Sequence, residues 1–360
     1  MTTAPTAIAA PASTRRRPRP SASFVRFLAR RLVALVLLAL GVTAVVFVLT
    51  QLVPSNAATA NLGEQAAADP AAVAAFKHHY GLDRPLPVRF GLYLWHVLHG
   101  DLGASALTHQ PVTKDLGQFV PATAELAVAS VVLAATFGIA FGVYAAMRRN
   151  RLADHLLRVV SLGGISMPTF WIALVALYVG FYRLGWFPGS DRLDPGQLPP
   201  PHKTGLYTLD ALLAGKWSLW WQATRHVALP ALVLAAFNVS LLTRYTRSAV
   251  LEVAGNDYVR AGRAKGLSER TVITRYILRA ALPSVITVLG LVFANVLTGT
   301  VLVEKIFSWP GVGQYAYSAA VGLDVPAIAG VSIFVAVVYI TINFVVDVLY
   351  GVIDPRIRVT

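Results

Sequence analysis

Long apolar runs separated by short polar segments dominate this sequence. Six runs reach the roughly 20 residues that a helix needs to cross a hydrocarbon core of about 30 Å, and they occupy residues 32–53, 120–146, 158–182, 227–249, 283–303 and 327–352. Gly163, Gly164 and Pro168 interrupt the third run, and Asn238 and Ser240 interrupt the fourth. A membrane tolerates such residues where neighbouring helices cover the exposed backbone groups. The pattern predicts an all-α polytopic membrane protein with about six transmembrane helices.

The composition agrees with a membrane protein and excludes several other classes. The 360 residues are 56% hydrophobic and 13% charged, whereas a soluble protein carries about a quarter charged residues, and the mean hydropathy is +0.61. The chain has no cysteine, so it has no disulfide framework and no thiolate metal site. The net charge of +14 is spread among the apolar runs, which argues against a nucleic-acid partner.

The lysines and arginines alternate in density between successive polar segments. If the N-terminus is cytoplasmic, 21 of the 31 basic residues fall on the cytoplasmic side, in the tail, after the second run, in the central loop and at the end of the chain. The outer segments are longer in total and hold fewer. This is the bias that orients membrane helices, and it predicts that both termini are cytoplasmic.

Residues 1–23 are rich in Ala, Thr, Pro and Arg and show no apolar period. We expect a disordered basic cytoplasmic tail, for which a solvated state is simpler than contact with anionic lipid. The first apolar run follows arginines and precedes Ala58-Thr59-Ala60, as a secretory signal and its cleavage site would. We favour a membrane span, because the run is longer than a signal core and further spans follow.

The first outer loop, about 54–118, contains one stretch with helical spacing. Its apolar positions suit an interfacial helix with aromatic rings at headgroup depth; they are Phe90, Tyr93, Leu94 and Val97, beside Trp95. His96 and His99 lie one helical turn apart and raise the alternative of a metal site. The pair lacks further ligands in the sequence, so we expect no metal.

The other two outer loops combine turn residues with aromatic ones. The second, about 183–226, holds Pro199, Pro200 and Pro201 and then three tryptophans that fit an interface belt, with substrate contact as the alternative: Trp217, Trp220 and Trp221. The third, 304–326, holds FSWPGVGQYAYSAA. There Pro310, Gly311 and Gly313 predict a turn before a short helix.

A search for catalytic chemistry finds no nucleotide-binding G-x-x-x-x-G-K-[ST], no H-E-x-x-H and no G-x-S-x-G. We therefore expect no catalytic residues, no metal and no enzyme activity. Within the predicted spans the acidic residues are Glu125, near the outer end of the second, and Asp347, near the inner end of the sixth. Hydration near an interface is the simpler account of both, because a proton relay would need a deeper series of such groups.

The densest run of arginines lies between two apolar runs, in DYVRAGRAKGLSERTVITRYILRAALP, residues 257–283. Asp257 can cap a helix from Tyr258 to about Lys265, Gly266 suits a left-handed C-terminal cap, and Ser268 can cap a second helix that runs toward Pro283. The first helix is only about 12 Å long, too short to cross a membrane. It is predicted to be a surface knob, and an ordinary basic loop that follows from the positive-inside bias is the alternative.

This segment resembles the cytoplasmic coupling motif of ABC-importer permeases of the dipeptide and oligopeptide family. The resemblance extends over nearly all of the chain after the tail. The similar stretches are Arg30-Arg31, YGLDRPLPVRF with GDLGAS, PATAEL, ISMPTFW, FSWPGVGQ and VVDVLYGVIDPRIR. The long first outer loop further resembles the B-type subunit, which pairs with a shorter C-type permease.

The resemblance implies a multi-pass protein of the inner (plasma) membrane with the type I ABC importer fold. It implies a second, C-type permease, two cytoplasmic ATP-binding subunits, an extracytoplasmic substrate-binding protein and a short peptide substrate. The lipid bilayer is the remaining partner; no cofactor is expected on this chain. The implied organisation is the tail, residues 24–119 with the first transmembrane helix and the long external loop, and residues 120–360 as a core permease domain with five helices.

The resemblance also assigns two sets of site residues. The expected ATPase-coupling residues are Asp257, Tyr258, Arg260, Ala261, Gly262, Arg263, Ala264, Lys265, Gly266 and Leu267. The expected external gate or binding-protein contact is Trp309, Pro310, Gly311 and Gly313. The chain departs from the family pattern in having Arg260, Ala261 and Gly262 where Glu-Ala-Ala is usual, and in the displacement of the following proline to Pro283.

Other substrates and mechanisms stay open at this level. Nickel chelates, glutathione or small glycosides are alternative substrates within the same importer class. An ion-coupled secondary transporter and a membrane scaffold that transports nothing are alternatives from other classes.

Overall fold

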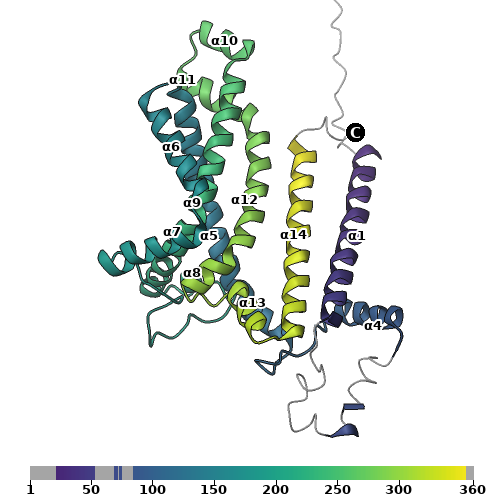
Figure 1. Ribbon diagram of the computed structural model, residues 1–360. Coiled ribbons are helices and arrows are strands. Elements are labelled where there is room, and N and C mark those ends of the chain that lie inside the picture. Colours follow the sequence, from purple (N-terminus) through teal and green to yellow (C-terminus); the bar gives the residue numbers. More distant parts are fainter. Residues whose placement is uncertain (1–21, 53–68, 72, 75–83, 354–360) are drawn as a thin grey trace, which may run out of the picture.

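The computed structural model describes residues 22–52, 69–71, 73–74 and 84–353, which fold mostly into helices (Figure 1). The long helices are α1 (Ala22–Leu52), α5 (Val112–Met147), α9 (Trp217–Ala254), α12 (Arg279–Ile306) and α14 (Val325–Ile353). The shorter ones are α4 (Leu86–Leu98), α6 (Leu152–Ser166), α7 (Thr169–Ala176), α8 (Tyr207–Leu213), α10 (Asp257–Ala264), α11 (Glu269–Thr271) and α13 (Val312–Val321), with π-helical η1 (Leu177–Arg183) and η2 (Val272–Leu278). The predicted all-α class is confirmed.

Among the described residues, five helices are long and apolar enough to cross a membrane, and the number is six if one bent pair counts as a single span. The prediction of about six spans is therefore confirmed, although several helices begin before the apolar run that was predicted to span the membrane. The second span begins at Val112, and the fourth begins at Trp217, so the three tryptophans lie in the first turns of α9. The predicted tail, apart from the first residues of α1, and the Ala58-Thr59-Ala60 stretch lie outside the described residues.

The third predicted span is not a straight helix. α6 and the α7–η1 helix meet at an angle of 105°, and the break falls at Met167 and Pro168. Met167 is extended, with φ −86° and ψ 130°, because the proline ring that follows disfavours the helical conformation at the residue before it. The single span of residues 158–182 is corrected to two helices around this bend.

Several short helices lie at the two opposite ends of the bundle of long helices. Figure 1 shows α10 and α11 at one end and α4, α8 and α13 at the other. α1 begins, and α14 ends, at the end that carries α10. The two outermost described residues, Ala22 and Ile353, are therefore on the same side as the segment predicted to couple to partners.

α9 is the central helix of the bundle and packs against α5, α6 and α12. Gly138 and Gly142 let α5 approach α9 closely, because a Cβ added at Gly142 would lie 2.6 Å from the Thr246 Cβ of α9. Two small residues one turn apart are a common device for close packing of membrane helices. At Gly164 of α6 an added Cβ would collide with the Ser240 side chain of α9, so both neighbours use glycine to approach α9.

α1 and α14 pack side by side and are covered at one end by α4. The predicted helix in the first outer loop is confirmed as α4. Its Phe90 and Tyr93 rings lie 5.4 and 5.5 Å from the Phe47 ring of α1, and Val97 packs on the same cluster. Trp95, on the other side of α4, is 61% exposed.

Candidate functional site

The coupling segment projects from the bundle on a small apolar anchor. In α10 only Val259 and Gly262 are buried, and Tyr258, Arg260 and Arg263 are exposed. Val259 belongs to a buried cluster drawn from three spans or their extensions: Ala146 of α5, Ala249 and Val250 of α9, and Val272, Ile277 and Ala281 of η2 and α12. A force on α10 would thus reach α5, α9 and α12 together.

The turn after α10 has the predicted geometry. Gly266 has φ +76°, a conformation that glycine adopts at little cost, and its N–H donates to the Arg263 carbonyl at 2.9 Å. Ser268 caps the second helix, since its hydroxyl accepts from the Thr271 N–H at 3.4 Å. The start of α10 needs a correction: Asn256 is the N-cap residue and Asp257 lies in the first turn. At this position the negative charge of the Asp257 carboxylate is stabilised by the positive end of the helix dipole.

The second helix of the segment does not stop at Pro283. α11, η2 and α12 run on without a break from Glu269 to Ile306, with Pro283 inside α12. Proline removes one helical hydrogen bond, and the adjacent π-helical turns show how the backbone accommodates a changed register. The second helix of the coupling segment and the fifth span are therefore one continuous helical stretch.

The predicted outer turn is built around a buried carboxylate that sequence reasoning missed. Glu304, in the last turn of α12, is fully buried and accepts hydrogen bonds from the backbone N–H groups of Gly313 and Gln314 at 2.7 and 3.1 Å. Thr123 of α5 donates to the same carboxylate at 2.7 Å. The Thr123 hydroxyl also accepts from the Val312 N–H at 2.8 Å. Glu304 and Thr123 thus satisfy all three N–H groups that begin α13.

The two glycines of FSWPGVGQ are explained by this contact. A Cβ at Gly311 would collide with the Glu304 carboxylate, and one at Gly313 would lie 2.6 Å from the Val301 Cα. Trp309 is 1% exposed and donates its indole N–H to the Ala122 carbonyl at 2.9 Å. Trp309, Gly311 and Gly313 are buried, and Pro310 is partly exposed. The turn predicted before a short helix is confirmed, while its role as gate or binding-protein contact stays a prediction.

The second outer loop folds back onto α5 through a buried ion pair. Arg192 donates to the Glu125 carboxylate at 2.6 Å, and both side chains are almost fully buried. Glu125 also accepts from the Thr208 N–H and hydroxyl at 2.7 and 2.6 Å. The Arg192 guanidinium lies 3.5 Å from the centre of the Tyr207 ring, a cation–π distance. The expectation that Glu125 is simply hydrated is therefore wrong. The side chain of Asp347 lies outside the described residues.

A second carboxylate closes the same loop locally. Asp210, at the start of α8, accepts from the Thr204 hydroxyl at 2.8 Å and from the N–H groups of Lys203, Thr204 and Gly205. Burial opposes ionisation of this side chain, but the hydrogen bonds together outweigh burial and lower its pKa. The loop that holds Arg192 is therefore stabilised by an ionised carboxylate.

The first outer loop is fastened to the outer ends of α13 and α14. Asp324 is fully buried and accepts from the Ser105 hydroxyl at 2.6 Å and from the Leu107 N–H at 3.1 Å. Asp115 of α5 accepts from the Tyr315 hydroxyl of α13 at 2.9 Å. Ser105 belongs to the GDLGAS stretch, so this stretch connects the loop to the element that follows the outer turn.

The histidine pair of the first outer loop is engaged within its own neighbourhood. The Nδ1 atom of His96 lies 3.1 Å from the Asp101 carboxylate, and that of His99 lies 2.8 Å from the Trp95 carbonyl. In the part of the chain that the structure describes, no group of three or more potential metal-ligating His or acidic side chains comes together.

At the α10 end, α6 and α9 are joined by a further buried ion pair. Arg247 of α9 donates to both carboxylate oxygens of Asp154 at 2.7 and 2.8 Å, and Asp154 is fully buried. The Asn150 N–H donates to the same carboxylate at 3.0 Å. Paired planar groups of this kind fix orientation as well as contributing energy.

Three of these contacts were missed from the sequence because their partners lie far apart in it. Arg192 had one usable signal: a glutamate inside a predicted span, Glu125, requires a counter-charge. Glu304 also had one, because it ends an apolar run and precedes two glycines. For Asp154 and Arg247, separated by 93 residues, the sequence carries no signal of pairing.

Two family models match most of the chain. The family model described as binding-protein-dependent transport system inner membrane component matches residues 138–359. A second model, for the N-terminal part of these membrane components, matches residues 24–127. Together the two matches include the outer turn, the coupling segment and all of the predicted spans except residues 128–137 of the second.

Individual relatives are similar over nearly their full length. The probable D,D-dipeptide transport system permease protein DdpB of Escherichia coli (strain K12) is 41% identical over 335 residues, which are 93% of this chain and 98% of the relative. The di/tripeptide transport system permease protein DppB of Pseudomonas aeruginosa (strain UCBPP-PA14) is 42% identical over 332 residues, 92% and 98% of the two chains. Among solved structures, a chain of the MetNI methionine ABC transporter in an inward-facing conformation aligns with a TM-score of 0.48 and 14% identity, covering 66% of this chain and 96% of that one.

Proposed function

Since the chain belongs to the family of binding-protein-dependent transport system inner-membrane components, we propose that it is the permease subunit of an importer that carries short peptides. The observation that supports the substrate class is the 38–42% identity, over nine-tenths of the chain, to three permeases named for dipeptide or di/tripeptide transport. Members of this class are multi-pass inner-membrane proteins that work with other subunits.

The proposed partners follow from the family. A second, C-type permease would complete the translocation path, two cytoplasmic ATP-binding subunits would supply the work, and an extracytoplasmic binding protein would deliver the peptide. This chain would carry no catalytic residue and no cofactor. The division into a first helix with its external loop and a core domain of residues 120–360 is part of the same proposal.

The proposed ATPase-coupling element is α10 with the Gly266 turn. Its exposed charged face suits a groove on a water-soluble partner, and its buried Val259 anchors it to α5, α9 and α12. Two of these helices, α5 and α12, also meet at the outer turn through Thr123 and Glu304. Closure of the ATP-binding subunits would then move both ends of a stiff bundle, as rigid-body rocking requires.

The assignment is tested by uptake in a strain that lacks this subunit. We expect the deletion to abolish uptake of a toxic tripeptide analogue and hence to confer resistance, and the restored gene to reverse both effects. Normal peptide uptake together with lost uptake of a nickel chelate, glutathione or a glycoside would reassign the substrate.

The transport class is tested separately with purified components. Peptide transport by this chain alone in vesicles, driven by an ion gradient without ATP-binding subunits, would replace the importer proposal by a secondary transporter. If removal of the ATP-binding subunits does not reproduce the phenotype of losing this chain, the alternative of a membrane scaffold that transports nothing would be favoured.

A further inference from the structure

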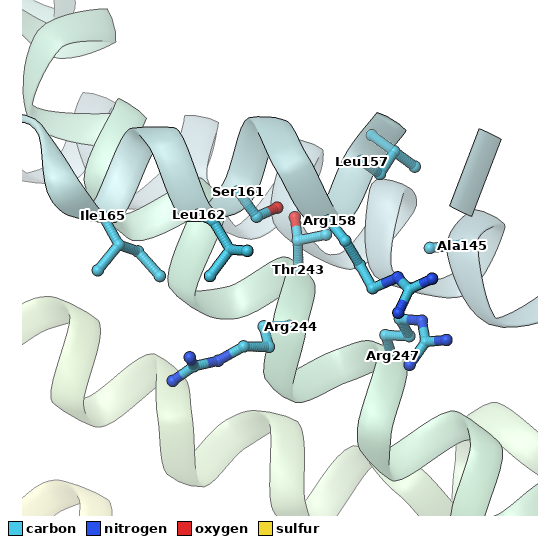
Figure 2. Close-up of a pocket in the computed structure, with 9 residues that line it drawn as sticks. All are labelled: Ala145, Leu157, Arg158, Ser161, Leu162, Ile165, Thr243, Arg244 and Arg247. Atoms are coloured by element: carbon cyan, nitrogen blue, oxygen red, sulfur yellow. The ribbon is translucent and has the colours of Figure 1, made fainter. Parts of the chain in front are cut away.

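A cavity of about 120 Å³ lies between α6 and α9, near the end of the bundle that carries α10. Figure 2 shows Arg158 and Arg247 together at one end of it, while Arg244 extends toward the end at which Leu162 and Ile165 lie. The wall is almost entirely carbon, because the arginines contribute their aliphatic stems and direct their charged groups outward. The cavity is thus apolar inside and cationic at its rim.

The rim carries more positive charge than its acidic neighbours neutralise. Asp154 is paired with Arg247 and lies 3.8 Å from Arg158. Arg244 is exposed and lies 5.7 Å from the centre of the Tyr245 ring. Among the described residues the structure records no ion pair for Arg244. One carboxylate faces three guanidinium groups, which leaves two positive charges beside an apolar cavity.

The apolar surface continues from the cavity along α6. Leu162 is 58% exposed, and Val159 and Val160 on the same helix are each 67% exposed. Exposed valine and leucine on a membrane helix present a surface that acyl chains cover without cost. A ligand with an acyl tail can therefore reach the cavity from the membrane, while its headgroup meets the arginines.

We propose that this cavity binds an anionic phospholipid, with the acyl chain against Leu157, Leu162 and Ile165 and the phosphate at the exposed guanidinium group of Arg244. Basic pockets between membrane helices on the cytoplasmic side suit anionic headgroups. A carbon wall suits an acyl chain better than it suits a peptide in transit, whose amide groups would lose their hydrogen bonds to water. The inference rests on the proposed function for one point, that the α10 end is cytoplasmic.

The bound lipid would tie α6 to α9 in addition to the Asp154–Arg247 ion pair. α6 leads into the bent α7–η1 helix, and α9 leads into α10, so the site lies between the proposed coupling element and a broken span. Anionic lipid is then expected to raise ATP-driven transport, because it stiffens the contact between α6 and α9 through which a movement of α10 would be transmitted.

The test uses the complete complex in vesicles of phosphatidylcholine with and without phosphatidylglycerol. Native mass spectrometry counts the phosphatidylglycerol retained by the complex, and uptake of a dipeptide is measured in the same vesicles. We expect Arg244→Gln to lower lipid retention about fivefold, because one arginine near an anionic surface contributes about 1 kcal/mol. Arg151→Gln is the matched control: it removes an exposed charge at the start of α6, outside the cavity, and should retain lipid normally.

Equal retention by the wild type, Arg244→Gln and Arg151→Gln would overturn the proposal. So would normal lipid retention in Arg244→Gln combined with lost discrimination between dipeptides with free and amidated C-termini, which would make the cavity a substrate site. Dipeptide uptake by the wild type in phosphatidylcholine alone tests the proposed function independently, so the two failures are distinguishable.

Discussion

At the scale of single residues, Glu304 shows how one buried carboxylate can organise a turn. The first N–H groups of a helix have no partners within it, and those of α13 lie inside the protein. Glu304 accepts from two of them and Thr123 from the third, while the positive end of the helix dipole favours the negative charge. Glycine is required at position 311 because the Glu304 carboxylate occupies the space of a side chain, and at position 313 because the Val301 backbone and the same carboxylate do.

Replacing Glu304 tests this account. In Glu304→Ala the N–H groups of Gly313 and Gln314 lose their acceptor, and each buried unsatisfied group costs about 1–3 kcal/mol. We expect a clear fall in the thermal unfolding temperature of the purified complex and a loss of transport. Glu304→Gln keeps a carbonyl oxygen as acceptor, so its unfolding temperature should lie between those of Glu304→Ala and the wild type. Lys305→Ala, at an exposed neighbour, should resemble the wild type. A Glu304→Ala complex as stable as the wild type would contradict the account.

At the scale of elements, the coupling segment combines a rigid helix with a sharply defined turn. α10 is only eight residues long, and a helix of that length is marginal in water by itself. Its position therefore depends on the Val259 anchor, on the Gly266 turn and on the ion pair between Arg263 and Glu269 at 2.9 Å. That pair is exposed and contributes little, so anchor and turn determine the orientation of the knob.

Substitutions at Gly266 separate the turn from the rest of the segment. A β-branched side chain resists positive φ, so Gly266→Val should reorient α10 at a cost of about 1–2 kcal/mol. Gly266→Asn is the matched control, because asparagine tolerates this conformation. We expect Gly266→Val to reach the membrane and pair with the second permease, yet to lose most peptide transport and substrate-stimulated ATP hydrolysis. Membrane abundance, co-purification of the ATP-binding subunits and hydrolysis are measured for both variants.

Wild-type coupling in Gly266→Val at normal abundance would show that this turn does not transmit the stroke. The segment would then be an ordinary basic loop. Equal loss in Gly266→Val and Gly266→Asn would show that the side-chain volume matters and not the backbone conformation.

At the scale of the whole molecule, two long helices connect the coupling segment with the outer turn. α12 continues η2 as far as Glu304, and α5 extends from Thr123 to the Val259 anchor. The outer loops are fixed to these helices by Asp324, Asp115 and the Glu125–Arg192 pair. If α10 is the ATPase-coupling element, the opposite face is therefore expected to move with the bundle when α10 is displaced.

The orientation of this body in the membrane is directly measurable, because the chain has no cysteine. Leu198, in the second outer loop, is 83% exposed, and Ala261 is exposed on α10. We expect a membrane-impermeant thiol reagent to label Leu198→Cys in intact cells and Ala261→Cys only in inside-out vesicles. Labelling of Ala261→Cys from outside the cell would reverse the predicted topology and exclude α10 as the ATPase-coupling element.

The sequence alone determined the features that depend on neighbours along the chain. The length of an apolar run decides whether a helix can span a bilayer, so the number of spans was predictable. The positive φ of Gly266 and the capping by Ser268 are likewise local, because each depends on one residue and its adjacent backbone.

The tertiary structure decided every feature that depends on residues brought together from a distance. Glu125 pairs with Arg192, 67 residues away in the sequence, and Thr123 bonds to Glu304, 181 residues away. Only packing establishes which charges are buried and must be paired. Packing also decides that Pro168 bends a span by 105° while Pro283 leaves α12 continuous. Pro168 ends up as the N-cap residue of α7, whereas Pro283 lies inside α12, and the two identical residues carry no local signal that separates these outcomes.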